Sequence, residues 1–178
     1  MMWPLKKGLR RFKSDEDGNA TVEFAIVFPA FMFLVVAGVE IGMVTLNHVM
    51  LERAVDLTVR DIRLGTGNAF QHDQIKTTIC NRAQFIDDCD DNLRLEMIPQ
   101  DPRAGLTIPD EPDCTDRTEE ARPVREFKNG QSNQLMVLRA CVKITPLIPT
   151  SGLGKKLANN PEGQYALTAT TAFVQEPQ

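Results

Sequence analysis

The hydrophobic pattern begins with a long apolar run that follows a charged N-terminal stretch. Residues 24–39 carry no charge, and the run extends to Leu46 if Glu40 is accepted within it. A membrane-spanning helix needs about 20 mostly apolar residues, so this run is long enough to cross a bilayer. Beyond it, helical spacing continues up to the glycine-rich residues 65–68, at Leu51, Val55, Thr58 and Ile62. The pattern predicts one helix from about Thr21 to Leu64.

The remaining pattern predicts a second helix and three strands. Asn68 and Gln71 have the spacing of a capping box, and the helix after them carries an apolar face formed by Ile75, Ile79, Ala83 and Ile86. Apolar and polar residues then alternate, as in half-buried strands, in residues 93–97, 136–144 and 165–173. The order indicates an α+β fold, in which a long N-terminal helix continues into a small head with a second helix and a three-stranded antiparallel sheet.

A fourth strand is an alternative for residues 124–128. "KNGQ" at residues 128–131 is typical of a hairpin turn. The strand before it would pair with the start of the second predicted strand. The preceding stretch 99–123 is rich in proline and acidic residues, and loops of this length are usually functional or disordered. We expect a mobile surface loop near residues 99–123 rather than a specific partner site.

Four cysteines all lie beyond the apolar run, which favours disulfide bonds in an oxidising compartment. Three pairings are open. We prefer Cys80 with Cys89, which are close in sequence, and Cys114 with Cys141, which would tie the long loop to the second strand. A zinc site is the alternative, but the sequence lacks the C-x-x-C spacing of such sites.

Charge differs between the start of the chain and the rest. Residues 1–18 carry five basic and three acidic side chains, a net charge of +2, and the remainder carries −6. Basic flanks stay on the cytoplasmic side of a membrane, so the cysteines are expected on the other side. An acidic body argues against nucleic-acid binding. The apolar run is also too long for an ordinary cleaved secretory signal peptide.

Three residues near the end of the apolar run have specific chemistry. Gly38 and Gly42 form a G-x-x-x-G spacing, which permits close packing of a second helix. Glu40 lies between them. It would either extend its carboxylate to the membrane interface, which is the simpler interpretation, or meet a partner.

The residues around Gly18 resemble a known processing site. Gly18 is followed by "NATVEF", directly before the apolar helix. This arrangement is similar to the prepilin processing site of tight-adherence (Tad/Flp) pili, and "DGNATVEFAIVFPAFMFLVVAGVEIG" resembles the TadE-like family of pseudopilins. The C-terminal "VLRACVKITPL" resembles a strand and Thr-Pro element of that family. The resemblance implies cleavage between Gly18 and Asn19 by an aspartic prepilin peptidase of the bacterial inner membrane.

The resemblance also suggests roles for Glu23 and Phe24 in recognition and assembly. After cleavage, Glu23 of one subunit could pair with the terminal ammonium group of a neighbour, as helices stack with a stagger. Leaving either charge buried without its partner would cost about 3–5 kcal/mol, by analogy with soluble proteins. The alternative is that Glu23 lies in the headgroup layer, where a helix N-terminus favours its charge.

These expectations divide the chain into four parts: a basic cytoplasmic leader to be cleaved (1–18), a transmembrane helix (19–46), its extension (47–64) and an extracytoplasmic head (65–178). The expected partners are the membrane, the prepilin peptidase and other pilin subunits. The other hypothesis is an unprocessed single-span envelope protein whose head binds an external partner. A retained leader would favour this second hypothesis.

Other motifs do not predict catalysis, a metal or a cofactor. His48 and His72 are far apart and lack matched carboxylates. The calcium-like run at residues 87–92 lacks the required glycine and the glutamate at position twelve. "GLGKK" at residues 152–156 lacks the phosphate-loop spacing. We therefore expect a protein that is not an enzyme.

Overall fold

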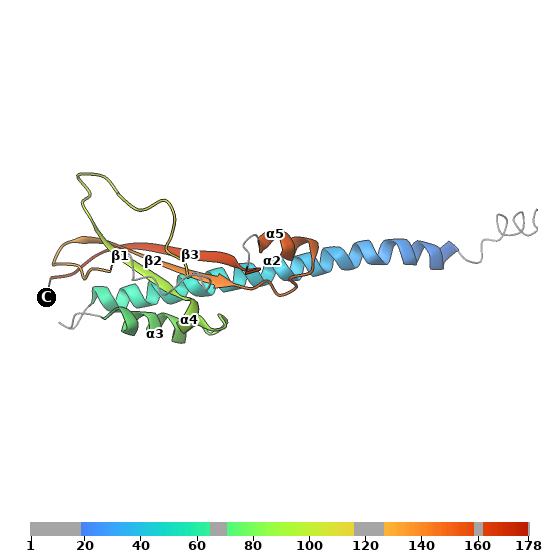
Figure 1. Cartoon of the computed structure of the whole chain (residues 1–178), viewed down its shortest axis with the longest axis horizontal. Coiled ribbons are helices and arrows are strands. Elements are labelled where there is room, and N and C mark those ends of the chain that lie inside the picture. Colours follow the sequence, from blue (N-terminus) through green and yellow to red (C-terminus); the bar gives the residue numbers. More distant parts are fainter. Residues whose placement is uncertain (1–18, 65–70, 116–126, 159–161, 178) are drawn as a thin grey trace, which may run out of the picture. The chain divides into compact units, whose positions relative to one another are not determined.

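The computed structural model describes residues 19–64, 71–115, 127–158 and 162–177 (Figure 1). Its elements follow the order α2 (Asn19–Arg63), α3 (His72–Arg82), α4 (Cys89–Asn92), β1 (Arg94–Gln100), β2 (Leu135–Ile144), α5 (Gly152–Leu157) and β3 (Tyr165–Val174). Contacts divide the chain within α2 into two compact units, Met1–Val39 and Glu40–Gln178. We call Glu40–Gln178 the C-terminal unit. The predicted α+β fold, with a long apolar helix and a three-stranded antiparallel sheet, is confirmed.

Helix α2 extends as the sequence predicted, with ends within two residues of those expected. Its second half has one buried face, because the residues at helical spacing turn toward the same side. The predicted face of Leu51, Val55, Thr58 and Ile62 is buried. The Thr58 hydroxyl donates to the Ala54 carbonyl, which satisfies this polar group within the core. Arg60 and Arg63 lie in the last turn, where the helix dipole favours positive charge.

The sheet has the order β1-β2-β3, and both pairings are antiparallel. Alternation places one set of side chains from each strand on the same face. On one face these side chains form a single core with α2 and α3, to which the sheet contributes Leu95, Met97, Met136, Leu138, Ala140, Val142, Tyr165, Leu167, Ala169 and Phe173. The core therefore lies between the sheet and the helices.

The alternative fourth strand beside β2 is wrong for a geometric reason. Both edges of β2 are already used, because Leu135 pairs with Gln100 on one side and with Val174 on the other. Phe127 instead forms an isolated parallel bridge with Met97, on β1. Residues 124–126 lie outside the described part of the chain.

Helix α3 starts later than the predicted capping box. Gln71 is the residue that precedes the helix, and its backbone N–H donates to the side-chain oxygen of Gln74 at 3.3 Å. The predicted cap residue Asn68 lies outside the described residues. Arg82, in the last turn, donates to Thr58 and to Asp61 of α2, which joins the two helices.

Both disulfide bonds have the pairing that the sequence favoured. Cys80 of α3 is bonded to Cys89 at the start of α4, and Cys114 is bonded to Cys141 of β2. Disulfides in a small domain restrict the unfolded chain and add about 2–4 kcal/mol each. The second bond fixes the long segment after β1 to the central strand.

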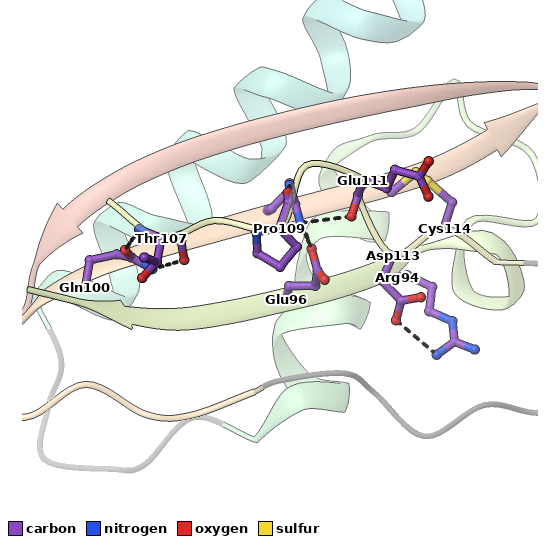
Figure 2. A network of polar contacts seen from close by, with 10 residues as sticks. Arg94, Glu96, Gln100, Thr107, Pro109, Glu111, Asp113 and Cys114 are labelled. Carbon is purple, nitrogen blue, oxygen red and sulfur yellow. Dashed lines mark hydrogen bonds and ion pairs between the residues drawn. A yellow bond between two sulfur atoms is a disulfide. The ribbon is translucent and has the colours of Figure 1, made fainter. Parts of the chain in front are cut away.

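Residues 101–115 cover the face of the sheet opposite the helices (Figure 2). The Gln100 side chain both accepts from the Thr107 N–H and donates to its carbonyl. Arg139 donates to the carbonyls of Pro109 and Glu111, at 2.7 and 3.4 Å. These contacts and the Cys114 disulfide argue against mobility in this part of the predicted loop. The predicted loop also began too early, since residues 99–100 belong to β1, and its remainder, residues 116–123, lies outside the described residues.

The polar face of β1 and β2 is consequently buried. Glu96 and Arg139 are partners across the two strands, and Arg139 Nε donates to Glu96 Oε2 at 2.6 Å. The exposed fractions of their side chains are only 2% and 8%. Arg94 and Asp113 form a second, longer ion pair at 3.5 Å nearby (Figure 2). The sheet face beneath residues 101–115 is therefore both polar and buried.

Candidate functional site: the apolar helix and the Glu40 clamp

The first half of α2 presents its apolar side chains outward. Only 6% of its most apolar stretch is buried, which distinguishes it from the core helix of a soluble protein. Phe24, Phe31 and Leu34 are between 57% and 68% exposed. The helix is long and apolar enough to cross a membrane by length and composition. A solvent-exposed apolar surface of this length indicates a membrane or a packing partner.

Of the two predicted processing residues, only Asn19 lies within the described part of the chain. Gly18 is outside the described residues, and α2 begins at the next residue, Asn19. Glu23 is exposed, one turn after the start of the helix. The Phe24 ring stacks on that of Phe28, with centroids 4.9 Å apart. The structure brings these residues together only as neighbours on one helix.

Gly38 and Gly42 are both exposed on α2. A Cβ atom built on either glycine would meet no described atom within 4 Å, apart from the backbone of the helix itself. The surface at both positions is therefore open, as close approach of another helix would require. Packing through these glycines stays a prediction.

Glu40 has a different role from the one expected. Its side chain does not extend to the surface, because the residue is only 1% exposed. Each carboxylate oxygen accepts one backbone hydrogen bond, from Leu147 N–H at 2.8 Å and from Ile148 N–H at 2.9 Å. The expectation that Glu40 extends its carboxylate outward to the membrane interface is therefore wrong, because the carboxylate is enclosed by the chain's own backbone. We call Glu40 and these two N–H groups the Glu40 clamp.

The clamp satisfies both the buried Glu40 carboxylate and the two backbone N–H groups. A buried carboxylate is costly unless hydrogen bonds replace its lost water. The two N–H groups belong to the loop between β2 and α5, where no sheet ladder supplies acceptors for them. Charge-assisted bonds to a carboxylate are shorter and stronger than neutral ones. The clamp thus fixes the loop to α2 at the first residue of the C-terminal unit.

The comparisons with known proteins identify the N-terminal part. Residues 18–60 match the family described as TadE-like protein. The match starts at the predicted processing glycine and covers most of α2, including Glu23 and Glu40. No curated protein and no solved structure matches the chain.

The TadE-like segment contributes one half of the clamp, and the loop after β2 contributes the other. The loop lies outside the matched residues, as does the Thr-Pro element that resembled the same family. The acceptor of the clamp, Glu40, is separated from the donors, Leu147 and Ile148, by more than 100 residues of sequence. The sequence did contain one indication of the clamp, because a single acid within an apolar run requires a partner.

Tyr165, at the start of β3, lies close to the clamp. Burial raises the pKa of Tyr165 above its ordinary value, and the negative charge of Glu40 raises it further. A hydrogen bond with the Asn47 side chain, from the TadE-like segment, acts in the opposite direction on this pKa. Tyr165 therefore reports on the charge of Glu40.

The pKa of Tyr165 provides the first testable prediction. It is the chain's single tyrosine, so tyrosinate absorbance measures it directly. We expect ionisation above the ordinary value of 10.0 in the folded chain and at that value in denaturant. Glu40→Gln should lower the pKa, because it removes a neighbouring negative charge, and Asn47→Ala should raise it. An unchanged pKa in Glu40→Gln would contradict this placement of the charge.

The sign of the pH dependence follows from linkage. Because the folded pKa is raised, the contribution of Tyr165 to stability is complete below the unfolded pKa of 10.0. It is lost as the pH rises through the higher folded pKa. The C-terminal unit should therefore lose stability in this alkaline range, and Tyr165→Phe should remove that part of the loss.

The two histidines make separate contacts and do not meet at a common site. His48 Nε2 lies 3.3 Å from the Thr168 carbonyl and 3.6 Å from Glu52, whereas His72 lies beside Asp73 and Phe127. Among the described residues, no group of three or more His, Cys, Asp or Glu side chains is placed to hold a metal ion.

Proposed function

We propose that this chain is a minor pilin or pseudopilin of a bacterial tight-adherence pilus. It is cleaved after Gly18 by a prepilin peptidase and assembles through its apolar N-terminal helix. The observation that carries the proposal is the TadE-like match, which begins at Gly18 and continues along an exposed apolar helix. The work of such a protein is mechanical, because it supplies a helix and a head to an assembly built by helix packing.

The proposal places the helix in the inner membrane with the leader in the cytoplasm. The excess of basic residues in the leader supports this orientation. The two disulfide bonds of the C-terminal unit also support it, because such bonds persist in oxidising compartments. The expected partners are the peptidase and other pilin subunits.

Processing is tested by the intact mass of the membrane-extracted chain. We expect a mature chain that starts at Asn19. Gly18→Gln should retain the leader, because glutamine adds a side chain at the scissile bond and favours helix there by roughly 0.5–1 kcal/mol relative to glycine. Gly38→Ala is the matched control, since its added Cβ meets open space, and it should be cleaved normally. A wild-type chain that keeps its leader would instead support an unprocessed envelope protein.

Assembly is tested separately by the charge of Glu23. Glu23→Gln should be cleaved normally but should enter the pilus fraction at least about tenfold less, because a buried terminal ammonium group would lose its partner. Glu16→Gln removes an equal charge from the leader and should have no effect after cleavage. Normal incorporation of Glu23→Gln would show that Glu23 only lies among headgroups.

A further inference from the structure

The loop and short helix after β2 form a compact surface next to the clamp. Residues 145–157 include the clamped loop and α5. Glu40 directly follows Val39, the last residue of the N-terminal unit. The peptide bond alone keeps Glu40, and the loop bonded to it, near the end of the exposed apolar segment.

Local hydrogen bonds give this segment a defined conformation. The Ile148 carbonyl accepts from Ser151 N–H, and the Ser151 hydroxyl accepts from Gly154 N–H, which caps α5. Gly154 packs so closely that an added Cβ would lie 2.2 Å from the Ile148 carbonyl oxygen. Leu157 packs against the core. Residues 145–157 therefore have a defined structure, and we call them the platform.

The platform exposes apolar and basic side chains together. Leu147 is 55% exposed although its own N–H is held by Glu40. Lys155 and Lys156 are exposed in the last turn of α5. Two adjacent lysines are notable in a chain whose net charge is −4. Ile41, which follows Glu40 on α2, is also 55% exposed.

We propose that residues 145–157 rest on the membrane surface, with Leu147 at the acyl boundary and both lysines on anionic phospholipid headgroups. This inference rests on the proposed membrane insertion of α2. The twenty residues from Ala20 to Val39 would span about 30 Å, the thickness of the hydrocarbon core. Glu40 then lies at the outer interface, and the clamp holds the platform there. The covalent link between Glu40 and an apolar helix of membrane-spanning length favours lipid over a soluble partner.

The chemistry of the platform matches that of an interfacial anchor. Apolar side chains that enter the headgroup boundary and lysines that attract anionic lipids act together in such anchors. A carboxylate at this level would be repelled by the same lipids if it faced them. The clamp removes that repulsion, because both oxygens of Glu40 face backbone N–H groups.

Quenching of tryptophan by brominated acyl chains tests the contact. The full chain, with its single tryptophan removed by Trp3→Phe, is reconstituted in vesicles of phosphatidylglycerol and phosphatidylcholine. We expect the fluorescence of Leu147→Trp to be quenched. Leu106→Trp is the matched control, because Leu106 is 63% exposed but follows the opposite end of the sheet, and it should not be quenched. Phe33→Trp, within the apolar segment, reports on insertion itself.

The role of the two lysines is tested by removing their charges in the Leu147→Trp chain. Lys155→Gln with Lys156→Gln should reduce the quenching at least about twofold in vesicles that contain phosphatidylglycerol, because lysines near an anionic surface add to binding. It should change little in phosphatidylcholine alone. Equal quenching of both chains in both vesicles would overturn the role of the lysines.

The two proposals fail in different ways. Quenching of Phe33→Trp without quenching of Leu147→Trp would overturn the platform contact and leave the membrane span intact. An unquenched Phe33→Trp would overturn the span, and with it both proposals.

Discussion

Replacing Arg139 by methionine is expected to lower the free energy of unfolding of the C-terminal unit by about 3–5 kcal/mol. The side chain of Glu96 is 2% exposed, so the substitution leaves a buried carboxylate without its partner. The carbonyls of Pro109 and Glu111 lose their donor as well. Hydrogen exchange of the β2 amides, measured on the full chain in detergent micelles, should become faster by about two to four orders of magnitude.

Two further variants separate the causes of this loss. Arg63→Met removes an exposed ion pair with Glu176 and should change stability by less than about 1 kcal/mol. Arg139→Met combined with Glu96→Leu removes the unpaired charge and should recover part of the loss, because apolar replacement of a buried pair is often neutral. The double variant does not restore the hydrogen bonds that Arg139 donates to the two loop carbonyls. A single variant as stable as the wild type would show that water reaches Glu96.

Local patterns in the sequence predicted most of the secondary structure. The 3.6-residue period placed α2 within two residues of its ends, and the alternation of β2 and β3 predicted both strands. These signals succeed because each depends on residues close in sequence. The disulfide pairing followed for a similar reason, since Cys80 and Cys89 are nine positions apart.

Contacts between distant segments could not be predicted in this way. The alternation in residues 93–97 and 136–144 correctly predicted a polar face on both strands, but nothing local showed that residues 101–115 would cover that face. The fourth strand failed because pairing depends on which edges of β2 are already occupied. The short helix α5 depends on the cap by Ser151 and on a close approach that only glycine at position 154 permits.

Glu40 illustrates the same difficulty for the candidate site. The sequence showed an acid surrounded by apolar residues, which predicted a free-energy cost of burying its carboxylate. It did not show which groups would offset that cost. Those groups are two backbone N–H donors, which any residue except proline can supply. Side-chain identity at Leu147 and Ile148 therefore carries no trace of the clamp. Only the fold brings the donors to α2.

Removing the carboxylate in Glu40→Ala is expected to destabilise the C-terminal unit by about 2–5 kcal/mol, because two N–H groups lose a charged acceptor. Glu40→Gln keeps a single acceptor oxygen and should show about half of this loss. Glu52→Ala removes an exposed acid from the same helix and should stay within about 0.5 kcal/mol of the wild type. Hydrogen exchange at Leu147 and Ile148 should accelerate first in Glu40→Ala, before the β2 amides respond. Unchanged exchange at both residues would mean that water replaces the carboxylate, and the loop would then not depend on Glu40 for its position on α2.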